Sequence, residues 1–196
     1  MTTEITIEKH PWTPYIPNDA RVLILGTFPP GKHRWAMDFY YPNPTNDFWR
    51  IIGIIFFKDK DYFYNRTAKR FDDNAIKQFI SSKKIAVGDT ALEVKRLKNN
   101  ASDKHLEIVT PINLSEIISN NPTCNTIIST GEKAAQTIAS LTSTTTPAIG
   151  EFITYDFTST RTINIYRMPS SSRAYPLSIE KKAEFYGKMF HEIGIF

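Results

Sequence analysis

Three short apolar runs constrain the fold of this chain more than any other feature of its sequence. They lie at 22–25, 85–87 and 126–129, and each is followed within two residues by a glycine. Runs of this length and composition are typical of strands that are buried on both faces. Segments with helical spacing separate them, so strands and helices alternate along the chain. This alternation predicts an α/β fold, a three-layer αβα sandwich around a short, mainly parallel central sheet.

Helices are expected where apolar residues recur at intervals of three and four residues. Six segments have this spacing: 48–56, 74–82, 91–98, 114–120, 132–141 and 179–193. The segments 152–157 and 162–166 instead alternate between apolar and polar residues, which predicts a hairpin. Residues 106–109 fit either a strand or the end of a helix.

The beginning of the chain differs from the rest. Three prolines in the second half of the first twenty residues prevent regular structure there. Trp12, Tyr15 and Ile16 can pin this stretch to the body of the protein. We therefore expect an N-terminal arm at 1–20 and one domain at 21–196.

Composition excludes several kinds of site. Cys124 is the only cysteine, so the chain can form neither an internal disulfide nor a cysteine-rich metal or iron–sulfur site. No base lies near Cys124 in the sequence, and we expect an inert thiol. The histidines contain no metal-binding pair, and we expect each to be a surface or structural residue. They are His10, His33, His105 and His191.

Charge and hydropathy also bound the function. The net charge of +4 agrees with a polyanionic partner without requiring one. No apolar run approaches the ~18 residues that a membrane span needs. The N-terminal sequence carries acidic residues and lacks the apolar core of a signal peptide. We expect a cytoplasmic protein, a monomer, that contacts no membrane and needs no metal and no cofactor.

Residues suited to chemistry follow the ends of three expected strands, at 26–30, 88–89 and 168–173. In a parallel sheet such strand ends lie side by side, and ligands bind there. The first of these loops continues into a stretch rich in tryptophan, phenylalanine and tyrosine at 35–49. Aromatic residues are costly to expose unless something covers or binds them. We therefore predict that this loop holds a flat, uncharged group, and that the group is a nucleobase.

Two of these loops allow alternative interpretations. Asp89 follows a buried strand, which favours a functional role, but aspartate before threonine is also a common helix N-cap. The serines at 170–172 lack the glycines of a nucleophile elbow. Such a hydroxyl triplet caps a turn, or it holds a phosphate through hydroxyl and backbone N–H groups.

The charged loop at 58–73 interleaves basic residues with Tyr62, Phe63 and Tyr64. Such a mixture suits single-stranded or distorted nucleic acid, because cations meet phosphates and rings meet bases. Alternatively, the loop is solvated and its aromatic side chains fold back on the core, which is the interpretation that we favour.

Five segments, taken in order, carry a family resemblance. They are LILGTFPP at 23–30, YYPNPTNDFW at 40–49, IAVGDTALEVKRLKNNASDKHL at 85–106, TIISTGEKAA at 126–135 and YRMPSSSRA at 166–174. Together they resemble the motifs of the uracil-DNA glycosylase superfamily, and most closely those of its hypoxanthine (deoxyinosine) DNA glycosylase branch. The resemblance implies a monofunctional DNA glycosylase of base-excision repair. Such an enzyme flips a deaminated base, hypoxanthine or uracil, out of DNA and hydrolyses its N-glycosidic bond without a metal.

The resemblance also implies roles for particular residues. Phe28 stands where much of the superfamily has a water-activating Asp or Asn, and Asn46 matches the asparagine that the hypoxanthine branch is thought to use instead. The implied base pocket consists of Gly26, Thr27, Phe28, Pro29, Tyr40, Tyr41 and Asp89. The implied DNA-binding loop consists of Pro169, Ser170, Ser171, Ser172 and Arg173.

Three alternatives stay open. Asn46 or Thr45 can simply cap the helix that begins at 48, without any chemistry. The family pattern has Arg in place of Thr45 and Trp in place of Gly88. Together with Phe28, these departures motivate a catalytically weak or inactive member that binds nucleic acid or a nucleobase. A further hypothesis is an enzyme that acts on a small nucleotide or nucleoside.

Overall fold

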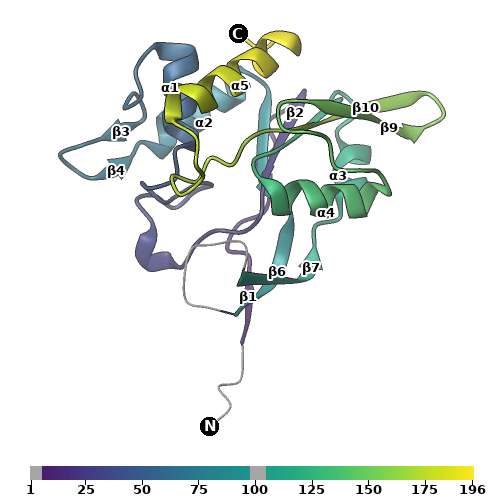
Figure 1. The fold of residues 1–196 in the computed structure, drawn as a ribbon, viewed down its shortest axis with the longest axis horizontal. Helices are drawn as coiled ribbons and strands as arrows, with labels where there is room; N and C mark the ends of the chain where they lie inside the picture. The colour runs from purple at the N-terminus through teal and green to yellow at the C-terminus, as the bar shows by residue number, and fades with distance from the viewer. Residues whose placement is uncertain (1–5, 98–104) are drawn as a thin grey trace.

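The computed structural model describes residues 6–97 and 105–196, and it is built around a five-stranded sheet (Figure 1). In order across the sheet, the strands are β5 (Ile85–Asp89), β2 (Val22–Gly26), β8 (Thr126–Ser129), β10 (Arg161–Arg167) and β9 (Phe152–Thr158). Neighbouring strands are parallel except for β9, which pairs antiparallel with β10 as the predicted hairpin. The mainly parallel central sheet is therefore confirmed.

Helices cover both faces of this sheet. On one face lie α1 (Phe48–Phe57), α2 (Asp73–Ser82) and α5 (Ile179–Glu192), and on the other lie α3 (Leu114–Asn120) and α4 (Glu132–Thr142). Figure 1 shows the two groups on opposite sides of β2.

The alternation of side chains along β2 explains these layers. Val22 and Ile24 pack in one core with the first group of helices, whereas Leu23 and Leu25 pack in a second core with the other group. A strand whose successive side chains point to opposite faces needs apolar residues at every position when both faces are covered. The continuous run at 22–25 therefore predicted the three-layer αβα sandwich correctly.

One expected helix is wrong. Residues 91–96 form β6 (Ala91–Arg96), which pairs antiparallel with β7 (Leu106–Pro111) and with β1 (Ile7–Lys9). These strands make a small second sheet at the bottom of the view in Figure 1. The helical spacing of the apolar residues predicted the wrong element here, because pairing with two neighbouring strands outweighs a weak local helix propensity. The end of the expected helix, at 98, lies outside the described residues.

The loop at 58–73 folds back on the domain. It contains a short hairpin of β3 (Tyr64–Asn65) and β4 (Arg70–Phe71). Phe63 is buried, and the Tyr62 ring stacks on Phe57 with 3.6 Å between ring centroids. The favoured interpretation, in which the aromatic side chains pack on the core, is therefore confirmed for Phe63, whereas Tyr62 packs on Phe57 but stays half exposed.

The described part of the N-terminal arm packs against the domain at two places. Its strand β1 joins the small sheet, and Tyr15 forms an antiparallel bridge with Val87. A short 3-10 helix, η1 (Lys32–Arg34), follows the first strand-end loop. Within the described ranges, no helix combines the length and the apolar composition needed to cross a membrane.

Gly26 provides a test of how tightly the end of β2 is packed. A Cβ atom at this position would lie 2.4 Å from Asp89 Oδ1 and 3.3 Å from Tyr41 Oη. We expect Gly26→Ala to lower the free energy of unfolding by ~1–3 kcal/mol, as is usual when a packed site is overfilled. Urea denaturation followed by circular dichroism measures the change.

The matched control is Gly187→Ala within α5. A Cβ atom there would meet Ile55 Cγ1 at an ordinary 3.8 Å. Because alanine is the better helix former, this variant should be neutral or more stable by up to about 1 kcal/mol. Equal stability of the Gly26→Ala variant and the wild type would show that the end of β2 is not tightly packed.

Candidate functional site

The carboxyl ends of β2, β5 and β8 converge, as the strand order requires. Gly26 and Asp89 are partners in the register of β2 and β5. Thr130 follows β8, and its backbone N–H donates to the Leu25 carbonyl at 3.1 Å. Tyr41 Oη lies 2.9 Å from Thr130 Oγ1 and so ties the aromatic loop to this edge of the sheet. We call Gly26, Tyr41, Asp89 and Thr130 the strand-end cluster.

The predicted DNA-binding loop adjoins this cluster. The Met168 N–H donates to the Ser129 carbonyl at 2.9 Å, which places the end of β10 beside the end of β8. Gly131 has a φ of 147°, and a Cβ atom there would lie 3.7 Å from Ser170 Oγ. The loops at 26–30, 88–89 and 168–173 are therefore brought to one edge of the sheet, as the sequence predicted.

Asp89 is buried and is held by a residue of the N-terminal arm. Its Oδ2 lies 2.9 Å from His10 Nε2, while His10 Nδ1 lies 2.7 Å from the Trp12 carbonyl oxygen. The His10 ring contacts the Phe28 ring edge-on, with 5.2 Å between ring centroids, and stacks on the Tyr40 ring, with 5.6 Å between ring centroids. Three residues of the predicted base pocket thus meet around His10.

His10 is the residue that sequence reasoning most clearly missed. It was expected to be a surface or structural histidine, and it is indeed a structural one, but its place beside Asp89 was not foreseen. The available signal was its neighbour Trp12, which suggested that the arm packs on the domain. Nothing in the sequence relates position 10 to position 89.

Tyr40 contributes a buried hydroxyl next to this carboxylate. Burial, with a further contribution from the negative charge of Asp89, raises the pKa of Tyr40 far above its ordinary value. Its Oη has no hydrogen-bond partner among the described residues. A buried hydroxyl without a partner costs ~1–3 kcal/mol, so the Tyr40 hydroxyl is an unused donor enclosed beside Asp89.

The residues of the predicted pocket that lie in the loop at 26–30 contact the second sheet. Phe28 is buried in a small core with Ala91 and Leu106 of the second sheet. The Thr27 carbonyl accepts from the Ala91 N–H at 3.2 Å, and the Pro29 carbonyl accepts from Arg96 Nη2 at 3.1 Å. The second sheet therefore holds the loop at 26–30 in place.

Asn46 lies between α1 and the DNA-binding loop. Its Oδ1 accepts from the Phe48 N–H at 2.9 Å, so it satisfies one of the free amides at the start of α1. It also forms an antiparallel bridge with Ser172. The N-cap residue of α1 is Asp47 and not Asn46, so the expected capping role falls one residue away from its predicted place. Asn46 Oδ1 has a second lone pair that can serve a further role.

Asp47 and Lys182 form a buried ion pair that sequence reasoning did not identify. Asp47 is 5% exposed and Lys182 is 0% exposed. Asp47 Oδ2 accepts from Lys182 Nζ at 3.2 Å, and Asp47 Oδ1 accepts from Arg173 Nη2 at 3.0 Å. We call Asp47, Arg173 and Lys182 the clamp. The signal for Lys182 was its spacing of four residues from the buried Tyr186, which places a charge on the apolar face of α5.

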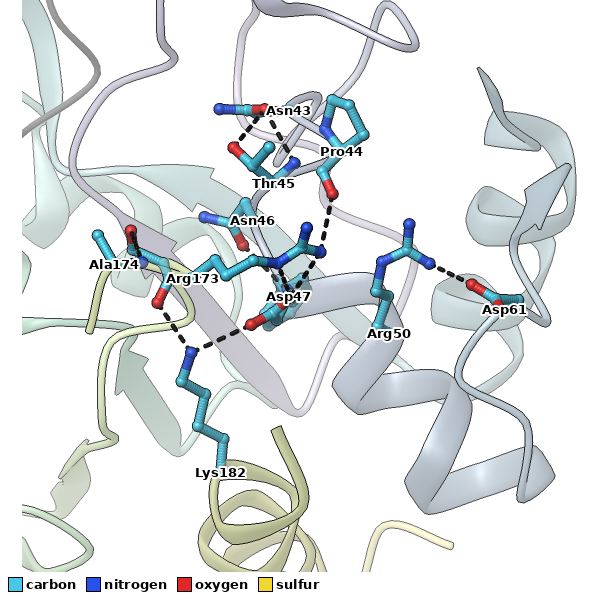
Figure 2. A network of polar contacts seen from close by, with 12 residues as sticks. Asn43, Pro44, Thr45, Asn46, Asp47, Arg50, Asp61, Arg173, Ala174 and Lys182 are labelled. Carbon is cyan, nitrogen blue, oxygen red and sulfur yellow. Dashed lines mark hydrogen bonds and ion pairs between the residues drawn. The ribbon is translucent and has the colours of Figure 1, made fainter. Parts of the chain in front are cut away.

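The clamp fixes the DNA-binding loop to the start of α1. Lys182 Nζ donates to the Ser172 carbonyl at 2.8 Å, and the Asp47 N–H donates to the Ser171 carbonyl at 2.8 Å. Figure 2 shows Lys182 extending from α5 toward Asp47. Within the loop, Pro169 and Ser171 are buried, whereas Arg173 is exposed and its guanidinium is turned toward Asp47.

Comparisons with known proteins address the fold. No protein-family model matches the chain, and no curated protein matches it. Among solved structures, it is similar to the solution NMR structure of a protein described as a "putative uracil DNA glycosylase" from Methanosarcina acetivorans. The TM-score is 0.63 at 17% sequence identity, over 96% of this chain and 99% of that chain.

The chain has a uracil-DNA-glycosylase-like fold. At 17% identity the likeness shows the fold alone, and it confirms the predicted α/β architecture. The uracil-DNA-glycosylase-like fold is here combined with a strand-end cluster that His10 completes and with a serine loop that the clamp holds.

In the described part of the chain, the side chains that could bind a metal lie apart from one another. In the ranges 6–97 and 105–196, no three His, Cys, Asp or Glu side chains are grouped so that they could hold a metal ion. Burial raises the pKa of the Cys124 thiol to about 11, so the thiol stays protonated near neutral pH. This agrees with the expected inert thiol.

A second charged cluster lies beside the clamp, on α1 and the loop that follows it. Asp61 makes ion pairs with both Arg50 and Arg66. The Arg50 guanidinium lies 4.4 Å from the centroid of the Tyr64 ring, a cation–π contact. Burial disfavours the charged carboxylate, but the hydrogen bonds and positive charges of Arg66 and Arg50 outweigh it and hold the pKa of Asp61 below its ordinary value.

This lowered pKa predicts a pH-dependent contribution to stability. A carboxyl whose folded-state pKa is lowered stabilises the fold above its unfolded pKa, and the contribution is lost as the pH falls through the folded pKa. Near pH 7 we expect Asp61→Asn to lower the free energy of unfolding by ~1.5–3 kcal/mol, the usual value of hydrogen bonds to charged groups. The difference should shrink below about pH 4, where carboxyls begin to protonate.

Urea denaturation of both proteins near pH 7, 5 and 3 measures this difference. Asp19→Asn serves as the control, because Asp19 is exposed and has no ion-pair partner in the described part of the chain. A loss of stability in Asp61→Asn that is the same at every pH would contradict the ion-pair interpretation.

Proposed function

We propose that this protein is a monofunctional DNA glycosylase of base-excision repair that releases a deaminated base, hypoxanthine or uracil, from DNA. One observation carries the proposal. The segments that resemble glycosylase motifs are far apart in the sequence, yet their loops meet at one edge of the sheet in a uracil-DNA-glycosylase-like fold. Ligands of parallel α/β sheets bind at this edge.

The donors and acceptors in the strand-end cluster match what deamination creates. Deamination replaces an amino group by a carbonyl oxygen and places a proton on the adjacent ring nitrogen. The Asp89 carboxylate can accept from that new N–H, and the unpaired Tyr40 hydroxyl can donate to the new carbonyl. His10 occupies Oδ2 of Asp89, whereas Oδ1 lies where Gly26 has no side chain.

Around these two groups, the other predicted pocket residues would enclose the base. Tyr41 is stacked on Phe48 at 4.0 Å and bonded to Thr130, so its ring has a fixed orientation. A flipped base is usually held between aromatic or apolar side chains. Phe28, Tyr40 and Tyr41 are the aromatic residues that we assign to this role, in a pocket with Gly26, Thr27, Pro29 and Asp89.

We assign to Asn46 the role of orienting the water molecule that attacks the sugar. Its Oδ1 accepts from the Phe48 amide and has one lone pair left, which can orient a water molecule. The adjacent serine loop would hold the DNA backbone through its hydroxyls and N–H groups, with the clamp keeping the loop in register with Asn46. Catalysis then relies on positioning and on oriented dipoles rather than on a strong acid.

A substrate panel tests the proposal. Single- and double-stranded oligonucleotides that contain deoxyinosine, deoxyuridine or deoxyxanthosine are incubated with wild type and with Asn46→Ala, and the released base is measured. We expect release from at least one substrate, and a loss of ~10²–10³-fold in Asn46→Ala, comparable to removal of one oriented catalytic group.

Because Asn46 Oδ1 also accepts from a free amide at the start of α1, the control must lose a comparable contact elsewhere. Asn113 Oδ1 accepts from the Glu116 N–H at the start of α3, so Asn113→Ala loses a similar contact away from the site. Both variants should lose ~0.5–2 kcal/mol of stability, but Asn113→Ala should retain base release. No release by the wild type from any substrate would sink the proposal. Release that Asn46→Ala leaves unchanged would contradict the role assigned to Asn46.

A second candidate is a catalytically weak or inactive protein that binds nucleic acid or a nucleobase. Two contacts favour it, the hydrogen bond that Asn46 Oδ1 accepts from the Phe48 amide and the engagement of Asp89 by His10. Saturable binding to damaged DNA without product would support it. DNA affinity that is absent, or that changes little with salt, would instead favour a small nucleotide or nucleoside as the ligand, because DNA binding through phosphates depends steeply on salt.

A further inference from the structure

A cavity of about 590 Å³ adjoins the clamp, since Asp47 and Arg173 line it, and lies between the starts of α1 and α5 and the loop after α1. We call it the basic cavity. Its charged lining residues are Asp47, Arg50, Lys60, Asp61, Arg66 and Arg173. The volume falls within the range of ~300–1,000 Å³ that is usual for ligand pockets.

The two carboxylates in this lining are already neutralised. Asp61 is paired with Arg50 and Arg66, and Figure 2 shows Arg50 reaching from α1 toward Asp61. Asp47 is paired with Arg173 and with Lys182, which lies behind the wall. Each carboxylate thus has two cationic partners.

The lining therefore has an excess of positive charge. It contains four cationic side chains against two carboxylates, and Lys60 makes no ion pair within the described ranges. The cap and first residue of α5, Ser178 and Ile179, also line the cavity, so the positive end of the helix dipole lies at its wall. This electrostatic environment favours an anion.

The donors are of the type that recognises phosphate. Guanidinium groups present N–H donors in a planar fork that matches phosphate oxygens. Arg50 is held in place by Asp61 and by the ring of Tyr64, and its buried Nε has no hydrogen-bond partner among the described residues. Arg173 and Arg66 add further guanidinium groups to the same cavity.

We infer that the basic cavity binds a phosphate group. The phosphate belongs either to the backbone of a DNA strand or to a free nucleotide. The first of these two sources rests on the proposed function. Continuity favours the backbone source, because Arg173 belongs both to the cavity and to the serine loop that we assign to DNA. A strand that passes over the loop would then place its next phosphate in the cavity.

The test compares two double variants that remove the same charge from the same loop. Lys60→Gln/Arg66→Gln removes exposed cations of the cavity, and Lys69→Gln/Arg70→Gln removes exposed cations outside it. Circular dichroism and urea denaturation first establish that both variants fold. Fluorescence anisotropy then measures the affinity for a labelled duplex from about 50 to about 200 mM salt.

We expect the cavity variant to lose ~10-fold or more in affinity for the duplex, with a salt slope shallower by about 1–2, because each phosphate contact contributes about one unit. The control variant should change less on both measures. An equal loss in the two variants, or no loss in either, overturns a backbone phosphate in the cavity.

Calorimetric titration with inorganic phosphate and with deoxyadenosine monophosphate tests the free source. Saturable binding by wild type that the cavity variant loses, with unchanged duplex affinity, assigns the cavity to a free phosphate. Absence of both effects overturns the inference altogether. Base release by wild type is measured separately, so that failure of the glycosylase proposal and failure of the phosphate site remain distinguishable.

Discussion

The buried ion pair between Asp47 and Lys182 is the interaction on which the candidate site depends. Removing two charges from water is expensive, and the pair is tolerated only because further hydrogen bonds satisfy both groups. Arg173 supplies one for Asp47, and the Ser172 carbonyl supplies one for Lys182. The pair joins the start of α1, the serine loop and α5, which are three separate parts of the chain. Together with the backbone bonds between these segments, the ion pair keeps Asn46 and the serine loop in register.

A second constraint comes from the small sheet and the arm. Strand β1 pairs with β6 and brings His10 to Asp89, while β6 and β7 bury Phe28 from beneath. A buried carboxylate must have a partner, and His10 provides it. The strand-end cluster is thus bounded by the main sheet on one side and by the arm on the other. The unpaired Tyr40 hydroxyl lies next to Asp89, and the Tyr40 ring stacks on His10 of the arm.

The sequence predicted those features that depend on neighbours along the chain. The continuous apolar run at 22–25 predicted a strand covered on both faces, and the hairpin of β9 and β10 followed from alternation. The hydrogen bond between Asn46 Oδ1 and the Phe48 amide spans two residues, so a local pattern was enough to suggest that Asn46 binds the start of α1, although the N-cap itself is Asp47. Residues 91–96 show the limit of this reasoning, because helical spacing and strand pairing compete and only the partners β1 and β7 decide.

The sequence by itself thus determined the α/β alternation, the sheet's apolar strands and the loops that carry the candidate residues. Only the tertiary structure decided which side chains meet. His10 and Asp89 are 79 residues apart, and Asp47 and Lys182 are 135 residues apart. The aromatic loop at 35–49, which was predicted to hold a nucleobase, is tied to distant parts of the chain by these two contacts, through Asp47 and through the stacking of His10 on Tyr40. Contacts of this kind depend on how strands and helices pack in space, and hydrophobic spacing along the chain carries no information about them.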